Sequence, residues 1–132
     1  MSERGSMLPM LGALIFTGLV VLGLALDVAL LGATYRRAAF AADTGAEAGA
    51  AALSVDDVYA GVLALDPAQA EGVAIEAAVR ARAAAGRTVS ASADRARVCI
   101  TVVDRYEPRL IGSLGIGPAN VTVTACAEPG RG

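Results

Sequence analysis

RGSMLPMLGALIFTGLVVLGLALDVALLGATYRRAAFAADTGAEAGAAAL, residues 4–53, is the stretch that decides the fold. Its first part, residues 6–26, contains 21 residues and no charge. At 1.5 Å per residue a helix of this length measures about 30 Å, which is the thickness of a hydrocarbon core. We therefore expect a transmembrane helix. A cleaved secretory signal is the alternative, but its apolar region is shorter, about 7–15 residues.

The uncharged run ends at Asp27. An Asp at the centre of a bilayer costs roughly 2.5–3.5 kcal/mol on insertion scales. The span should therefore shift until Asp27 reaches a membrane interface, and we interpret this residue as a membrane boundary. A functional intramembrane carboxylate is the other interpretation. Charge does not settle the orientation, because Arg4 precedes the span and Arg36 and Arg37 follow it.

Nothing in the sequence stops this helix at the membrane. No Pro occurs between Pro9 and Pro67, so we expect a continuous helix from about Leu8 to Leu53. Its last part is rich in small residues, with two glycines spaced for close approach of a neighbouring backbone. The expected helix-packing interface comprises Ala41, Ala42, Asp43, Gly45, Glu47 and Gly49. The neighbour is either a helix of another subunit, with Asp43 and Glu47 pairing its arginines, or this chain's own C-terminal half.

Composition argues against several classes of function. The net charge is −2 and the pI about 5.0, whereas nucleic-acid binding requires a clustered basic face. All eleven cationic residues are arginines, and there is no His, the commonest general base and a common metal ligand. The carboxylates are scattered, and no glycine-rich phosphate-binding motif occurs. We expect no enzyme activity, no metal, no cofactor and no small-molecule substrate.

The residues after the long helix predict two shorter helices. Ser54 is placed to cap a short helix with Asp57 in its first turn, and Val58, Tyr59 and Val62 would form its apolar side. A second helix begins after Asp66, with Pro67 in the first helical position and Gln69 completing a capping box. Gly86 is placed to end it, and Glu76 and Arg80 form a pair four residues apart. We expect this helix to lie on a sheet.

The apolar period then changes to two residues. Residues 88–93, 97–103 and 120–126 alternate between apolar and polar side chains, which predicts three half-buried antiparallel strands. Residues 93–96 would form the first turn, and residues 104–119 a long return loop with one helical turn near Leu110. Cys99 and Cys126 lie on the polar faces of two strands. One register brings them together as a disulfide, which implies an oxidising compartment; two free thiols are the alternative.

The order of these features resembles the TadE/TadG-like proteins of tight-adherence (Tad) pilus systems. Arg4, Gly5 and Ser6 match the start of that pattern, and an apolar span follows. The matching second block comprises Ala41, Ala42, Asp43, Ala48, Gly49 and Ala50. In the C-terminal half, residues 115–127 are similar to the family's terminal strand pattern. The resemblance covers most of the chain.

This resemblance implies a minor pilin-like subunit or an assembly factor in the inner membrane, with the N-terminus cytoplasmic and the C-terminal part outside the cytoplasm. Pilin precursors are cut after a Gly, and a Glu follows five residues beyond the cut. Gly5 and Ser6 would be the processing site here, but the position of the Glu is occupied by Met10. We therefore expect a permanent anchor.

These observations together predict an α+β, pilin-like fold. Residues 1–53 form the transmembrane and extended helix, and residues 54–132 form a small extracytoplasmic head with one or two helices on a three-stranded antiparallel sheet. The expected partners are the membrane and other pilin-like or pilus-assembly subunits. Two alternatives remain: a membrane-anchored binding module with a passive helical stalk, and a soluble exported enzyme released by a signal peptidase.

Overall fold

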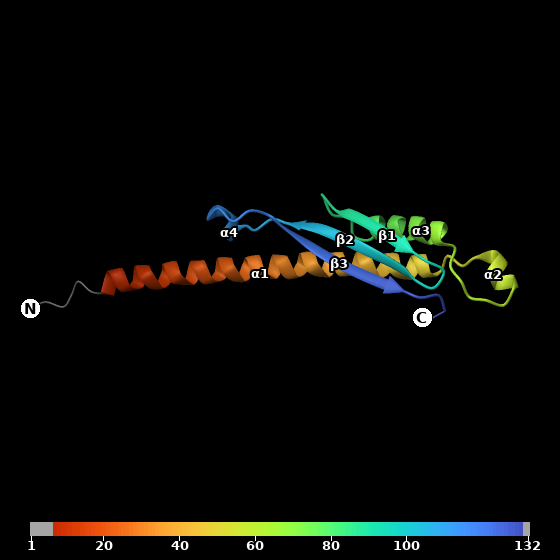
Figure 1. Cartoon of the computed structure of the whole chain (residues 1–132). Helices are drawn as coiled ribbons and strands as arrows, with labels where there is room; N and C mark the ends of the chain where they lie inside the picture. Colours follow the sequence, from red (N-terminus) through yellow and green to blue (C-terminus); the bar gives the residue numbers. More distant parts are fainter. Residues whose placement is uncertain (1–6, 131–132) are drawn as a thin grey trace, which may run out of the picture.

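One long helix runs through most of the molecule (Figure 1). The computed structural model describes residues 7–130, and α1 (Met7–Ala50) is a single uninterrupted helix of 44 residues. It begins and ends within a few residues of the predicted bounds. Its first half projects alone, and its second half lies against a small head formed by the rest of the described chain. The prediction of a continuous helix is confirmed.

The head contains a three-stranded antiparallel sheet in the order β1-β2-β3. The strands are β1 (Thr88–Ala93), β2 (Val98–Tyr106) and β3 (Ala119–Ala127). The predicted alternation is confirmed most clearly in β2, where the buried residues face the helices. This strand continues three residues beyond the predicted end, because Asp104 and Tyr106 extend the buried face with polar groups that find partners inside the protein.

Three short helices complete the head: α2 (Val55–Tyr59), α3 (Pro67–Arg80) and α4 (Leu110–Ser113). The predicted caps of the first two are present. The Ser54 hydroxyl accepts a hydrogen bond from the Asp57 N–H at 3.5 Å, and the Asp66 carboxylate accepts one from the Gln69 N–H at 3.2 Å. The predicted helical turn after β2 is α4, which lies at the end of the head nearest the N-terminus, whereas α2 lies at the opposite end (Figure 1).

Helix α3 ends earlier than its sequence predicts. The last helical residue is Arg80, and Gly86 lies in the turn before β1 with φ = +75°. Arg82 already has a positive φ of 45°, so the chain leaves the helical conformation before it reaches the glycine. The glycine therefore shapes the turn, and the guanidinium of Arg87 supplies partners for the terminal carbonyls.

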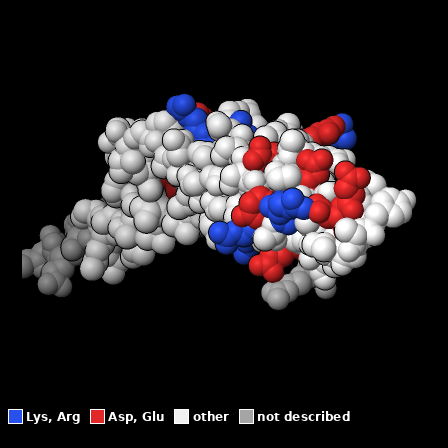
Figure 2. Space-filling model, turned by 45° about the vertical axis from the view of Figure 1, so that its right-hand side comes forward, with Lys and Arg blue, Asp and Glu red and all other residues white. Residues whose placement is uncertain are grey.

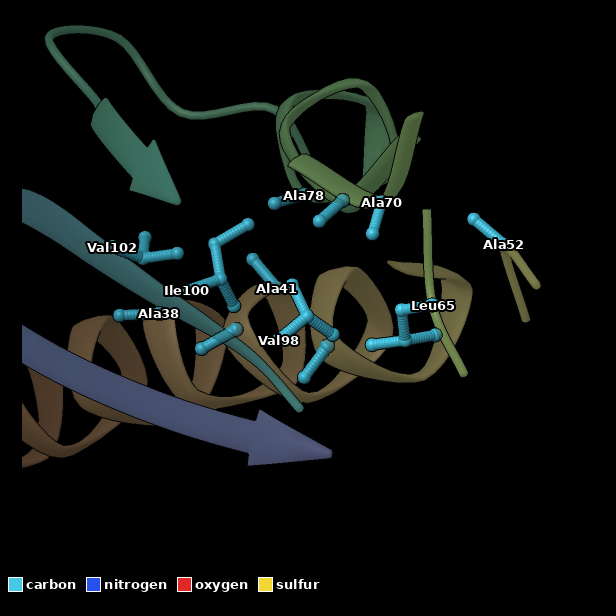
Figure 3. Packing of buried hydrophobic residues seen from close by; sticks show 12 residues of the cluster. Ala38, Ala41, Ala52, Leu65, Ala70, Ala78, Val98, Ile100 and Val102 are labelled. Atoms are coloured by element: carbon cyan, nitrogen blue, oxygen red, sulfur yellow. The ribbon is translucent and has the colours of Figure 1, made fainter. Parts of the chain in front are cut away.

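The core of the head is made largely of alanine (Figure 3). Helix α1 contributes Ala38, Ala41, Ala42 and Ala46, and α3 contributes Ala70, Ala74 and Ala78. Val98, Ile100 and Val102 of β2 fill the space between these two helices. Side chains this small let helix backbones approach closely, and the larger β-branched side chains of the sheet pack against them. The head is therefore built on α1 and has no separate core of its own.

Candidate functional site

The small-residue face of α1 packs within the chain itself. Ala41, Ala42, Gly45 and Gly49 are buried against α3 and β2. A Cβ at Gly45 would lie 2.8 Å from the Ala74 carbonyl oxygen. The predicted close-packed interface therefore exists, and of the two expected neighbours it is this chain's own C-terminal half, and not another subunit, that covers these four residues. The physical reason is that α3 presents its own alanine face, so two small-residue helices satisfy each other within one molecule.

Asp43 and Glu47 have a different environment from the rest of that predicted interface. Both side chains are exposed, one helical turn apart, on the flank of α1. They line a shallow groove beside the end of β3, together with Arg97 and Glu128. This flank remains accessible to another molecule.

Asp27 is the best-satisfied polar group on α1. Its side chain is 1% exposed, although it was expected to face a membrane interface. Its carboxylate accepts hydrogen bonds from three consecutive backbone N–H groups, those of Arg109 (2.7 Å), Leu110 (3.0 Å) and Ile111 (2.8 Å). The sequence placed Asp27 at a boundary and gave no sign of this contact, because its partners lie more than 80 residues away and are backbone groups.

Two further contacts hold the same loop on α1. The Tyr106 hydroxyl donates a hydrogen bond of 2.9 Å to the backbone carbonyl of Asp27. The Leu110 side chain covers Gly23, where an added Cβ would lie 2.3 Å from a Leu110 methyl carbon. Gly23 therefore makes room for α4, and the β2–β3 connection is fixed to the helix by one carboxylate, one hydroxyl and one apolar contact.

Arg87 and Asp104 form a buried ion pair that the sequence did not predict. Their side chains are 4% and 2% exposed, and two hydrogen bonds of 2.6 and 2.7 Å join the guanidinium to the carboxylate. The hydrogen bond with Asp104 raises the pKa of Arg87. The guanidinium also donates to the carbonyls of Ala78 and Ala81 at the end of α3. The Arg87 side chain, on the residue that precedes β1, thus joins the end of α3 to β2.

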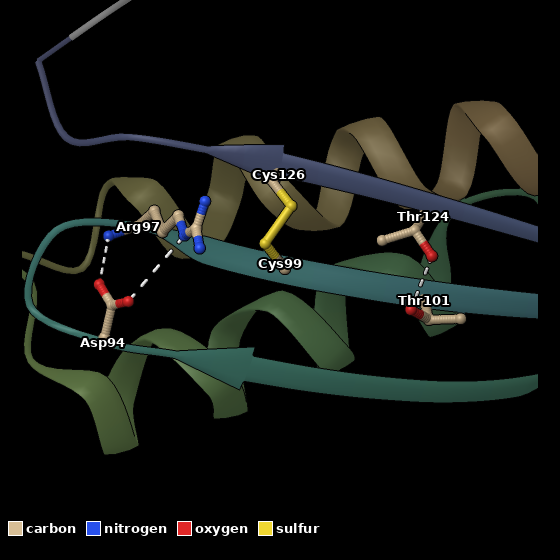
Figure 4. Close-up of a disulfide and its surroundings, with 6 residues drawn as sticks. All are labelled: Asp94, Arg97, Cys99, Thr101, Thr124 and Cys126. Atoms are coloured by element: carbon tan, nitrogen blue, oxygen red, sulfur yellow. Dashed lines mark hydrogen bonds and ion pairs between the residues drawn. A yellow bond between two sulfur atoms is a disulfide. The ribbon is translucent and has the colours of Figure 1, made fainter.

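Cys99 and Cys126 form a disulfide across β2 and β3 (Figure 4). They are directly opposite each other, so the strands adopt the one register that was expected to bring them together. Thr101 and Thr124, the next pair on the same face, share a hydroxyl hydrogen bond of 2.9 Å. The predicted pairing is confirmed.

The turn between β1 and β2 depends on a carboxylate. Asp94 accepts hydrogen bonds from the N–H groups of Ala96 (2.7 Å) and Arg97 (2.9 Å), which lower its pKa. The predicted turn is therefore present, but it comprises residues 94–97 and not 93–96, because Ala93 still belongs to β1.

The projecting half of α1 is apolar and exposed. Its exposed side chains include Leu14, Phe16, Leu19 and Leu22, and the helix is long and apolar enough to cross a membrane. Figure 2 shows the charged side chains gathered on the head, while the other end of the described surface on this face is almost uncharged.

A second exposed apolar group lies on and after α2, at the opposite end of the head. Val58, Tyr59 and Val62, which were predicted as the apolar side of that helix, are exposed. They are exposed because the five-residue α2 lies in a loop whose two ends are joined by the pairing of Leu53 with Leu65. This loop does not lie on the sheet.

Within residues 7–130 no three His, Cys, Asp or Glu side chains converge to hold a metal ion. The expected processing site, Gly5 and Ser6, lies outside the described residues. No protein-family model, curated protein or solved structure matches this chain.

Proposed function

We propose that the chain is a single-pass membrane protein that acts as a minor pilin-like subunit or an assembly factor of a Tad-type pilus. The assignment to a pilus system rests on the sequence resemblance, and the architecture is compatible with that assignment. The observation that carries the proposal is the division of α1 into an exposed apolar half and a half that forms the core of the head. A helix of this kind anchors the protein in lipid and transmits any force on the head directly to the anchor.

The proposed topology places the N-terminus in the cytoplasm and the head outside it. The Cys99–Cys126 disulfide supports this orientation, because disulfides persist in oxidising compartments and are rare in the cytosol. The membrane in question is the inner membrane, as the resemblance implies.

The proposed contact with neighbouring subunits uses two surfaces that the head leaves uncovered. One is the apolar half of α1, which can pack against homologous helices in the membrane or in a filament. The other is the flank carrying Asp43 and Glu47, which suits arginines on a partner. The buried glycine face is not part of this contact.

The test is a charge reversal at the exposed flank. Asp43→Arg with Glu47→Arg leaves the core intact and should abolish surface filaments seen by electron microscopy, with unchanged membrane levels and an intact disulfide. Asp56→Arg, an exposed carboxylate on α2, is the matched control and should leave piliation normal. Normal piliation in the double reversal would contradict the proposed contact.

The exposed apolar tip favours a second candidate, an anchored module that binds a ligand. Val55, Val58, Tyr59, Val62 and Leu63 are exposed at the end of the head opposite α4. The helix is not a passive stalk in this candidate either, because its second half fills the core. Replacing Tyr59 and Leu63 with Ser separates the two functions: lost adhesion with normal filaments favours the binding module, and lost filaments favour the subunit.

A further inference from the structure

The connection between β2 and β3 begins with the charged residues Glu107 and Arg109, but the rest of it is apolar where a connection in water is normally polar. No charged residue occurs from residue 110 to residue 127. Leu114 and Ile116 are 76% and 58% exposed, at the end of the head nearest the N-terminus. The segment that carries them packs on the apolar half of α1 through the contact of Leu110 with Gly23.

The contacts of this connection fix its level along α1. Leu110 packs on Gly23, which lies inside the uncharged run of residues 6–26. If that run spans the hydrocarbon core, α4 lies about 6 Å nearer the bilayer centre than Asp27, because four residues separate Gly23 from Asp27.

The carboxylate of Asp27 does not prevent α4 from lying at this depth in the bilayer. Its carboxylate is buried and receives three N–H hydrogen bonds, so its charge is compensated inside the protein. Further along the same connection, the N–H groups of Leu114, Gly115 and Ile116 donate to carbonyls of the connection itself. Backbone groups that are paired in this way can enter an apolar environment at much lower cost than free ones.

The next exposed charges along α1 are those of Arg36 and Arg37, which line one groove with Arg82. From residue 7 to residue 35 the helix measures about 43 Å, close to the thickness of a bilayer with its headgroups. Arginine side chains on a helix lean towards its N-terminus and reach for headgroups. These three cations and the exposed Arg109, which lies beside Asp27, are therefore placed to reach the headgroups, and Leu110, which packs on Gly23, lies deeper.

We propose that residues 110–118 insert into the outer leaflet of a phospholipid bilayer beside α1. The three hydrogen bonds accepted by Asp27, called the clamp below, hold these residues against the helix. The head is then docked on the membrane at two places, and its orientation to the bilayer is fixed. This inference rests on α1 spanning a membrane and is independent of any role in a pilus.

The chain contains no Trp, so one introduced Trp reports its own depth. Leu114→Trp in the full chain is reconstituted into phosphatidylcholine vesicles with brominated acyl chains. Phe16→Trp in the span and Tyr59→Trp, at a position 89% exposed on the tip, are the references. We expect Leu114→Trp to show blue-shifted emission and quenching comparable to Phe16→Trp. Emission and quenching like those of Tyr59→Trp would overturn the proposal, and so would an unquenched Phe16→Trp.

The clamp is tested by adding Asp27→Leu to Leu114→Trp. Leucine suits the span but offers no acceptor for the three N–H groups, so quenching at position 114 should be lost while the disulfide still forms. Gly18→Leu, at a helical glycine with open space around it, is the control and should leave the quenching unchanged. Unchanged quenching with Asp27→Leu would overturn the clamp.

Discussion

Arg87 stabilises the head through three partners, as many as the Asp27 carboxylate has. It pairs with Asp104 and supplies donors to the last carbonyls of α3, and both charges are removed from water. Removing one partner of such a pair leaves the other charge buried and uncompensated. The cost then exceeds any net gain that the pair itself provides.

Replacement of Arg87 by Met should therefore lower the free energy of unfolding by about 3–5 kcal/mol. Chemical denaturation of the full chain in detergent, followed by circular dichroism, measures this loss. Arg105→Ala removes an exposed pair with Glu107 and should cost no more than about 1 kcal/mol. Equal losses in the two variants would contradict the role of the buried pair.

The two glycines of the α1–α3 contact give a second prediction at this scale. Gly45→Ala places a methyl group 2.8 Å from both the Ala74 carbonyl oxygen and the Ile100 Cδ1 atom. Overpacking costs about 1–3 kcal/mol, more than the helix propensity that alanine gains, about 1 kcal/mol at most. The melting temperature should fall for Gly45→Ala and stay constant or rise for Gly32→Ala, where the space is open. Stabilisation by both would show that α3 does not approach α1 this closely.

Patterns within one element predicted the structure well, and contacts between distant residues did not follow from sequence. The caps at Ser54 and Asp66 and the alternation around Cys99 depend on neighbouring positions, so they can be read from the chain. The pairing of Arg87 with Asp104 and the capture of three N–H groups by Asp27 depend on how the elements come together. The small-residue face indicated close packing but did not identify the partner.

At the scale of elements, the disulfide closes β2 and β3 across the long connection between them. The two cysteines are 27 residues apart, and a loop of this size should contribute about 3 kcal/mol by restricting the unfolded chain. Cys99→Ala with Cys126→Ala should lower stability by that amount in equilibrium denaturation. The same loss should appear in the unsubstituted protein after reduction, and a reduced protein as stable as the oxidised one would contradict it.

The sequence predicts a division of the chain after residue 53 into a helix and a head, and this boundary can be tested with fragments. It falls just after α1 ends, but the alanines of the core lie on both sides of it. A fragment of residues 54–132 should therefore fail to unfold cooperatively, whereas a fragment of residues 28–132 should keep a cooperative thermal transition. Circular dichroism compares the two directly. A folded 54–132 fragment would show that the head does not need α1.

At the scale of the whole molecule, the protein is one uninterrupted helix with an apolar first half and a head built around its second half. The cysteines report the side of the membrane on which the head lies, because the chain contains only these two. Both lie on the face of the sheet away from the helices, where a reagent can reach them after reduction.

The most direct test is labelling of Cys99 and Cys126 in intact cells with a membrane-impermeant maleimide, before and after treatment with an impermeant reductant. We expect no labelling before reduction and labelling of both cysteines after it, without cell lysis. Labelling that appears only after the cells are lysed would place the head in the cytoplasm and contradict the account.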